Sequence, residues 1–257
     1  MSLLFCLLGS GSKGNAIFVK AGAQGLLIDA GLSARQITLR LEAAGFAAHD
    51  VTTIVVTHEH RDHLAGVDVL ARRHRLTVTS TPATWSAAPS MPGVRHQPLD
   101  AGRSFTVGGL SLTPFSIPHD ARDPVGLVVA AGGVRLGVCT DLGKPTGLVR
   151  QRLAGCQALI LEANHDPGLL ARGPYPEWLK QRVRGAHGHL SNQDAAGLLG
   201  ELCHPGLGQV VLAHLSEKNN RPELALAAAR EALAAHGSAA GLCAARQDAP
   251  SPVFRLE

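Results

Sequence analysis

The most constraining feature of this sequence is the run His58-Glu59-His60-Arg61-Asp62-His63, which directly follows an apolar, β-branched stretch. That stretch is predicted to be a strand, so the run begins at a strand end. Two imidazoles two residues apart in extended backbone can point the same way and bind one metal ion. Asp62 and His63 can then turn toward a second ion. Three imidazoles and a carboxylate favour zinc, iron or manganese over calcium, which prefers oxygen ligands.

A pair of metal ions needs further ligands, and three candidates each follow a predicted strand: His119, Asp141 and His214. A carboxylate has two oxygens, so Asp141 suits a position between two cations. Taken alone, His119 or His214 would more often be an ordinary exposed or hydrogen-bonded histidine. Because the run that begins at His58 already indicates a metal site, we expect His119 and His214 to be ligands of it instead.

Short apolar segments alternate with turns and helical patterns along the chain. We expect strands over residues 3–8, 16–20, 25–29, 53–57, 77–80, 104–107, 110–116, 125–130, 134–140, 158–162 and 209–213. We expect helices over residues 34–44, 65–75, 192–203 and 222–236. Several strands are separated by turns too short for crossover helices, which favours two mixed β-sheets flanked by helices over one parallel sheet. No linker, charge block or internal repeat divides the sequence, so residues 1–257 are expected to form a single domain.

Composition limits the class of protein. The sequence is 45% hydrophobic and 17% charged, which is typical of a chain with a large core and excludes global disorder. A net charge of +4 suits a polyanionic substrate and equally an ordinary basic protein. The five cysteines form no Cys-x-x-Cys motif, which indicates a reducing compartment. We find neither a signal sequence nor a membrane-spanning stretch, and expect a cytoplasmic protein without membrane contact.

These metal positions, in this order, resemble the metallo-β-lactamase superfamily. The resemblance extends to Leu27-Ile28-Asp29-Ala30-Gly31, whose Asp supports the metal loop in that superfamily. It implies an α/β (α+β) fold, an αββα sandwich with the site at one edge. It assigns His58, His60 and His119 to one metal, Asp62, His63 and His214 to the other, and Asp141 to a place between them.

Two further motifs resemble those of the superfamily's phosphodiesterases, which include the tRNA 3′-processing endonucleases: Leu161-Glu162-Ala163-Asn164-His165-Asp166 and Gly188-His189-Leu190-Ser191-Asn192. This resemblance implies that His189 donates a proton to the leaving oxygen, while Glu162 orients His189 and raises its pKa. We count Asp62 with them as catalytic. The alternative for His189 is a helix-entry residue before a cap formed by Ser191 or Asn192.

The complete ordered set of motifs resembles the YycJ/WalJ-like branch, single-domain bacterial metallohydrolases without an inserted second domain. The resemblance implies two divalent metal ions (zinc, manganese or iron), a nucleic-acid partner in the form of DNA ends, and exonuclease activity in DNA repair or replication. The oligomeric state stays open. Arg61 departs from the usual small polar residue of that branch and could hold phosphate or face solvent.

Alternatives remain for the substrate and for several residues. A small-substrate metallohydrolase, either a cyclic-nucleotide phosphodiesterase or a thioester hydrolase, is the main rival, and a non-catalytic scaffold is the second. The loop 9–15 suits either phosphate binding or a tight turn. Lys180, Arg182 and Arg184 could contact a nucleic-acid backbone or form a solvated helix face, and no aromatic ladder for stacking single strands is evident.

Overall fold

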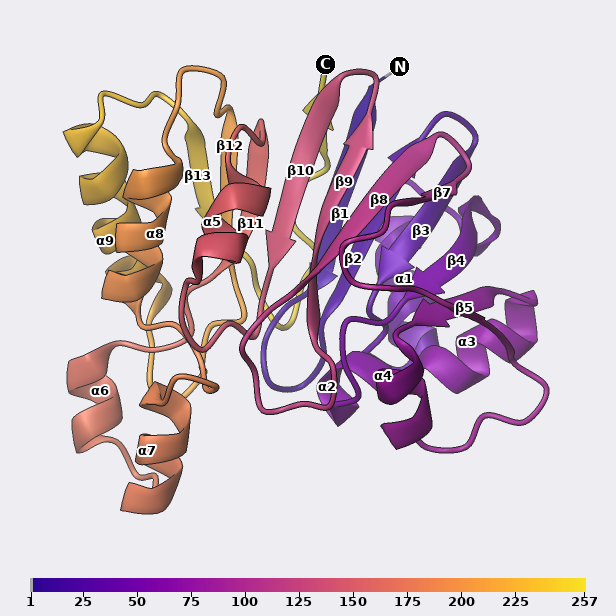
Figure 1. Cartoon of the computed structure of the whole chain (residues 1–257), viewed down its shortest axis with the longest axis horizontal. Helices are drawn as coiled ribbons and strands as arrows, with labels where there is room; N and C mark the ends of the chain where they lie inside the picture. The colour runs from indigo at the N-terminus through magenta and orange to yellow at the C-terminus, as the bar shows by residue number, and fades with distance from the viewer. Residues whose placement is uncertain (1) are drawn as a thin grey trace.

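Two seven-stranded β-sheets lie face to face in the computed structural model, which describes residues 2–257 (Figure 1). The first sheet has the order β14 (Phe254–Leu256), β1 (Leu3–Gly9), β2 (Ala16–Ala21), β3 (Gln24–Ile28), β4 (Val51–Val55), β5 (Thr77–Ser80) and β6 (Arg95–Pro98). The second has the order β13 (Gly241–Ala244), β12 (Gln209–Ala213), β11 (Ala158–Glu162), β10 (Val134–Cys139), β9 (Val125–Ala131), β8 (Leu110–Ser116) and β7 (Phe105–Val107). Each sheet is antiparallel over one half and parallel over the other, so the predicted mixed sheets are confirmed.

Helices cover the outer faces of both sheets, which completes an αββα sandwich (Figure 1). Those associated with the first sheet are α1 (Ala34–Ala43), a 3-10 turn (Ala48–Asp50), α2 (Arg61–Leu64), α3 (Val67–His74) and α4 (Pro82–Ala87). Those associated with the second are α5 (Gly147–Leu153), α6 (Pro167–Arg172), α7 (Glu177–Arg184), α8 (Asn192–Leu202) and α9 (Pro222–Ala235).

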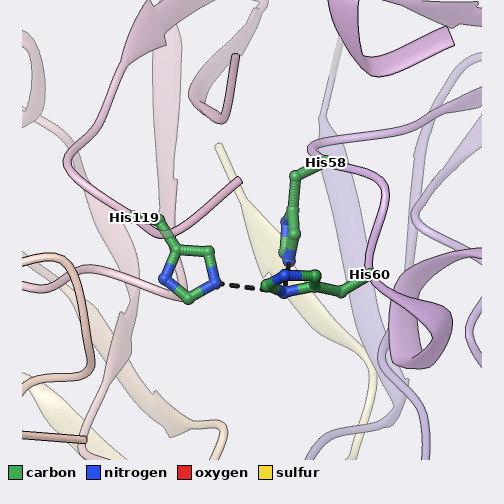
Figure 2. A group of neighbouring side chains, drawn as sticks. All are labelled: His58, His60 and His119. Atoms are coloured by element: carbon green, nitrogen blue, oxygen red, sulfur yellow. Dashed lines mark hydrogen bonds between the residues drawn. The ribbon is translucent and has the colours of Figure 1, made fainter. Parts of the chain in front are cut away.

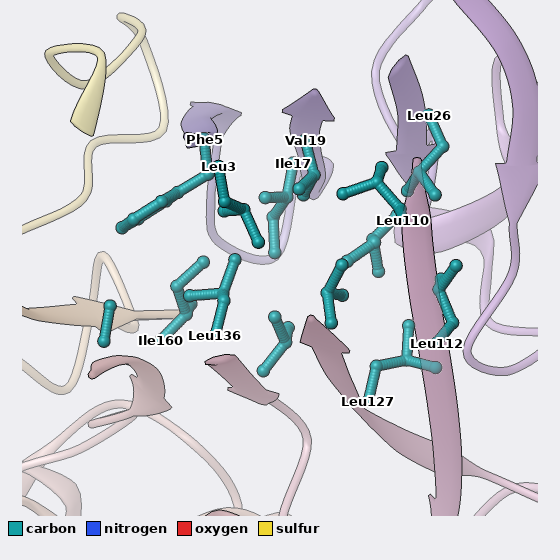
Figure 3. Packing of buried hydrophobic residues seen from close by; sticks show 14 of the residues in the cluster. Leu3, Phe5, Ile17, Val19, Leu26, Leu110, Leu112, Leu127, Leu136 and Ile160 are labelled. Atoms are coloured by element: carbon teal, nitrogen blue, oxygen red, sulfur yellow. The ribbon is translucent and has the colours of Figure 1, made fainter. Parts of the chain in front are cut away.

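The main core lies between the two sheets and is mostly aliphatic, as the low aromatic content requires. Leu3, Phe5 and Val19 of the first sheet face Leu136 and Ile160 of the second (Figure 3). The same strands are also buried on their outer faces, beneath the helices. Burial on both faces explains why these strands appear in the sequence as nearly continuous apolar runs.

The predicted strands all occur, with ends within two residues of those expected. The helix expected over residues 65–75 is confirmed as α3, while the single turn α2 just before it was not predicted; Gly66 separates the two. The Gly66 N–H donates to the carbonyl of Ala30 at 2.7 Å, and a Cβ at Gly66 would lie 2.2 Å from the carbonyl oxygen of Leu32. This close approach to the loop after β3 has room only for glycine, and it ends the turn α2 before α3 begins.

Several short elements were not predicted: α4, α5, α6, α7, β6, β13 and β14. Strand β6 is largely exposed, and α7 is only eight residues long with no buried residue, so neither has the long buried apolar face that reveals an element in sequence. Across residues 2–257, no helix combines the length and apolarity needed to cross a membrane.

Candidate metal centre

The carboxyl ends of the parallel strands meet at one edge of the sandwich, and the chain turns sharply there. Among residues 2–257, four non-glycine residues have left-handed backbone, and three of them follow strands at this edge. They are Asp29 after β3 (φ 60°), Asp141 after β10 (φ 58°) and His214 after β12 (φ 54°). Such backbone is sparsely populated and concentrates at functional sites. The turns direct three polar side chains into the same place.

A first cluster consists of three imidazoles from two distant loops, His58, His60 and His119 (Figure 2). Nδ1 of His60 lies 3.1 Å from Nε2 of His58 and 3.3 Å from Nε2 of His119. Nδ1 of His58 contacts the Thr57 hydroxyl at 3.0 Å, and Nδ1 of His119 contacts the Gly188 carbonyl at 3.2 Å. These outer contacts leave each Nε2 directed inward. Donor nitrogens around a tetrahedral zinc lie about 3.3 Å apart, so this spacing fits a metal ion.

A second cluster consists of Asp62, His63 and His214. Nε2 of His63 and Nε2 of His214 each lie 3.5 Å from Oδ2 of Asp62. The Nδ1 atoms are held from outside, by Asp29 at 2.7 Å for His63 and by Glu162 at 2.8 Å for His214. The support from Asp29 matches the role that the sequence resemblance implied. Nε2 of His214 is buried and has no hydrogen-bond partner, as expected of a nitrogen that donates its lone pair to a metal ion.

Asp141 lies between the two clusters with only 2% of its surface exposed. One carboxylate oxygen is 3.3 Å from Nε2 of His63, and the other is 3.9 Å from Nε2 of His119. The first of these oxygens is buried without a hydrogen bond. A buried carboxylate oxygen without a partner is costly, and a cation would satisfy it.

The charges around the site favour a cation. Burial lowers the pKa of His58 and of His119, so both are neutral donors at neutral pH. Burial would raise the pKa of Asp141, but the nearby His214 and His63 hold it well below its usual range. Burial would lower the pKa of His214, yet Asp141 and other carboxylates raise it to about 10. The buried carboxylates therefore attract positive charge, for which a proton and a metal ion compete.

Glu162, the last residue of β11, connects the second cluster to a further histidine. Its Oε1 lies 2.8 Å from Nδ1 of His189 and 2.8 Å from Nδ1 of His214. Its Oε2 accepts hydrogen bonds from the N–H groups of Leu142 and Leu190. Burial would raise the pKa of Glu162, but the charge of His189 and the hydrogen bonds to His189 and His214 lower it to about 2. In turn, burial would lower the pKa of His189, and the Glu162 carboxylate raises it above its usual value.

The alternative for His189 placed it at a helix entry before a cap formed by Ser191 or Asn192, and Ser191 is that cap. The Ser191 hydroxyl caps α8 by accepting from the N–H of Asp194 at 3.1 Å. His189 takes no part in that cap, and its ring lines a pocket of about 230 Å³ beside both clusters. The other lining residues are Ser12, His60, Asp62, Asp120, Asp141, Asn164, Tyr175, Leu179, Arg182, Val183, Gly188, His214 and Ser216.

Comparison with known proteins accords with this geometry. Residues 25–215 match the family model of the Beta-lactamase superfamily domain. The chain is 34% identical over 247 residues to Exodeoxyribonuclease YycJ of Bacillus anthracis, which covers 94% of this chain and 93% of that protein. The chain belongs to the YycJ/WalJ-like branch of the metallo-β-lactamase superfamily. Exodeoxyribonuclease WalJ of Streptococcus pneumoniae, another relative, is 33% identical over 86% of this chain and 84% of its own length.

Solved structures of the metallo-β-lactamase superfamily share the fold at low identity. The metallo-β-lactamase fold protein YhfI of Bacillus subtilis superposes with a TM-score of 0.75 at 14% identity, covering 100% of both chains. Zn(2+)-bound PqqB of Methylobacterium extorquens superposes with a TM-score of 0.68 at 21% identity, also covering 100% of both chains. Membership of this superfamily makes the chain a metal-dependent hydrolase, and the two histidine-rich clusters are its candidate metal-binding groups.

Some residues that shape this metallo-β-lactamase site were not singled out in the sequence. Asn15 ends the loop 9–15, and its Nδ2 lies 3.3 Å from Asp62 and 3.2 Å from His63. Its Oδ1 accepts from the Gly11 N–H at 2.9 Å, while Ser10 accepts from the backbone N–H of His214. The loop 9–15 is therefore a tight, largely buried turn that supports the metal-binding loop.

Asp120 and Arg182 connect the first cluster to α7. One oxygen of Asp120 lies 3.5 Å from Nε2 of His119, and the other accepts from Nε of Arg182 at 2.5 Å. Partial burial would raise the pKa of Asp120, but the bond to Arg182 and the nearby charges of His119, Arg182 and His60 together lower it. These two residues are 62 positions apart, so no local pattern reveals the pair. Arg61, by contrast, is exposed and lies outside the residues that line the pocket.

Proposed function

We propose that this chain is a two-metal phosphodiesterase that removes nucleotides from DNA ends in repair or replication. The observation that carries the proposal is the buried Glu162, which holds His189 at the wall of the pocket. Two relatives of this chain, of nearly equal length, are named exodeoxyribonucleases, which supports DNA as the substrate. The proposal places the activity on a single domain, because both sheets share one core.

The donor sets fit divalent metal ions. In this proposal His58, His60 and His119 hold one cation, Asp62, His63 and His214 hold the other, and Asp141 lies between them. Imidazole and carboxylate donors suit zinc, manganese or iron. Two such cations would lower the pKa of a water molecule and neutralise the phosphoryl oxygens.

The protein's own contribution is the delivery of a proton. When the phosphorus–oxygen bond of a phosphodiester breaks, the leaving oxygen needs a proton to become a hydroxyl group. With Nδ1 of His189 held by Glu162, its Nε2 is the nitrogen left to donate that proton. The Glu162 carboxylate stabilises the protonated ring and keeps this orientation. The leaving group of a thioester is a thiolate, which has less need of protonation by an acid. The Glu162–His189 pair therefore favours phosphodiesters as substrates.

The test is cleavage of end-labelled DNA by the purified chain, loaded in turn with manganese, zinc and iron. We expect labelled nucleotides to be released, and a chelator or the Asp141→Asn substitution to abolish their release. Absence of cleavage with every metal, together with turnover of a thioester, would contradict the proposal.

A further inference from the structure

A helical arm formed by α6, α7 and the turn between them (residues 167–184, called the arm below) projects beyond the edge of the sandwich (Figure 1). The arm follows β11 and leads to His189, so it lies beside the pocket. It carries four cations, Arg172, Lys180, Arg182 and Arg184, against a single carboxylate, Glu177. Its net charge is therefore +3, while the whole chain carries only +4. Positive charge is concentrated on one projecting element, as expected where a polyanion binds.

The arm also exposes aromatic surface. Trp178 is 65% exposed, the highest value among the large hydrophobic residues that stand out on the described surface. It lies four residues before Arg182 on α7, and residues at this spacing share one face of a helix. Since Arg182 lines the pocket, Trp178 continues the same face one turn farther out. An exposed indole beside cations is typical of surfaces on which bases of a single strand stack.

A second aromatic ring lies nearer the metal clusters. Tyr175 lines the pocket, and Nζ of Lys218 lies 5.9 Å from the centre of its ring. Lys218 itself is exposed, in the segment that follows His214. The pocket thus has an aromatic ring and a cation at its rim, on the side of the arm.

The arm is connected directly to the proposed acid. The backbone N–H of His189 donates to the carbonyl of Val183, in the last turn of α7, at 2.8 Å. Gly188 packs so closely that a Cβ there would lie 2.2 Å from the same carbonyl oxygen. Only glycine fits this approach, so the position of α7 and the position of His189 are linked.

We propose that the arm binds the strand of single-stranded DNA that enters the site, with Trp178 stacking on a base outside the pocket and Arg184 near the phosphates. This inference rests on the proposed function and names the form of its substrate. Paired bases are stacked within a duplex and offer no free face, so the arm selects single-stranded ends.

The test is the affinity of the full chain for a fluorescent oligodeoxythymidylate of about 12 nucleotides, within the usual site size of such surfaces. We expect Trp178→Ala to weaken binding roughly 10-fold, as the loss of one stacked base predicts. Leu39→Ala, at a residue of α1 that is 46% exposed, is the matched control and should bind normally. Equal unfolding midpoints will show that both variants fold alike.

A second pair of variants tests the charges. Arg184→Gln should weaken binding about threefold and reduce its dependence on salt, because one phosphate contact is lost. Arg103→Gln removes the same charge from a side chain that is 83% exposed, just before β7 at the other end of the second sheet, and should bind normally. Affinity for a blunt duplex should be lower than for the single strand and should not depend on Trp178.

The outcomes separate the two proposals, because affinity is measured without turnover. If Trp178→Ala and Leu39→Ala bind the single strand equally, or if duplex is bound as well as single strand, the arm proposal is wrong. If binding depends on Trp178 but no metal supports cleavage, the proposed function is wrong and the arm proposal stands. If the chain does not bind DNA at all, both are wrong.

Discussion

Oε1 of Glu162 lies 2.8 Å from Nδ1 of His189, on a carboxylate with no exposed surface. Buried carboxylates need partners, and this one has two backbone N–H groups and two imidazoles around it. The contact fixes which nitrogen of His189 faces the pocket. In the proposed function it separates His189 from the metal ligands, because the bond to Glu162 leaves His189 to donate a proton.

His189→Ala should therefore retain both metal ions and slow phosphodiester cleavage. The loss of a general acid typically costs a factor of about 10²–10⁴ in rate. Metal content by mass spectrometry and the rate of DNA cleavage are measured on the same preparation. His187→Ala, at an exposed neighbour, is the control and should cleave DNA normally. If His189→Ala loses metal, His189 is a ligand and the assigned role is wrong.

Asp29→Asn should weaken metal binding while the chain still folds. Asp29 accepts from the backbone N–H of Thr57 with one oxygen and contacts Nδ1 of His63 with the other. An Asn amide would place an N–H donor against Nδ1 of His63 and shift the ring proton to Nε2, the candidate donor atom. Asn tolerates the left-handed backbone here. We expect metal affinity to fall roughly 10- to 100-fold in a competition titration with a chelator; unchanged affinity would refute the tautomer argument.

Gly31→Ala should displace the metal-binding loop. A Cβ at Gly31 would lie 1.6 Å from the carbonyl oxygen of Asp62, which also accepts a hydrogen bond from the N–H of Asn15 at 2.8 Å. We expect a loss of stability of about 3 kcal/mol or more, as for other severe overpacking, together with loss of metal. Gly147→Ala is the matched control, because nothing lies within 4 Å of its added Cβ. Chemical denaturation of both variants measures the difference; equal stability would show that the loop yields easily.

Asp50→Asn tests a pH dependence away from the metal site. Burial would raise the pKa of Asp50, but bonds from Lys20 and the N–H of Ala47 lower it. A lowered pKa in the folded state contributes stability above the ordinary value, about 3.9, and that stability is lost as the pH falls through the lower folded value. The variant should be about 1 kcal/mol less stable than wild type at pH 7. The difference should shrink as the pH falls below about 3.9, the ordinary value, in urea unfolding; a constant difference would contradict the linkage.

Much of the fold was predictable because its signals are local. Long apolar strands are buried on both faces, and each candidate ligand follows such a strand, so His119 or Asp141 could be found from strand ends. Elements without a buried face gave no such signal. Helix α7 is an example, since its residues contact the pocket and solvent instead of the core.

The supporting contacts of the site could not be predicted for a different reason. Asn15 meets Asp62 across 47 residues and Asp120 meets Arg182 across 62, so only the folded chain brings them together. The break between α2 and α3 has the same origin, because Gly66 lies in close contact with the loop after β3. The local sequence pattern therefore predicts the candidate ligands at strand ends, whereas the contacts that support them depend on tertiary packing.

The most direct test of the two-metal nuclease is a titration of the chelated chain with manganese, followed by release of labelled nucleotides from single-stranded DNA. We expect the rate to rise to a plateau after two equivalents of metal per chain. A plateau at one equivalent, or no release of nucleotides at any metal concentration, would contradict it.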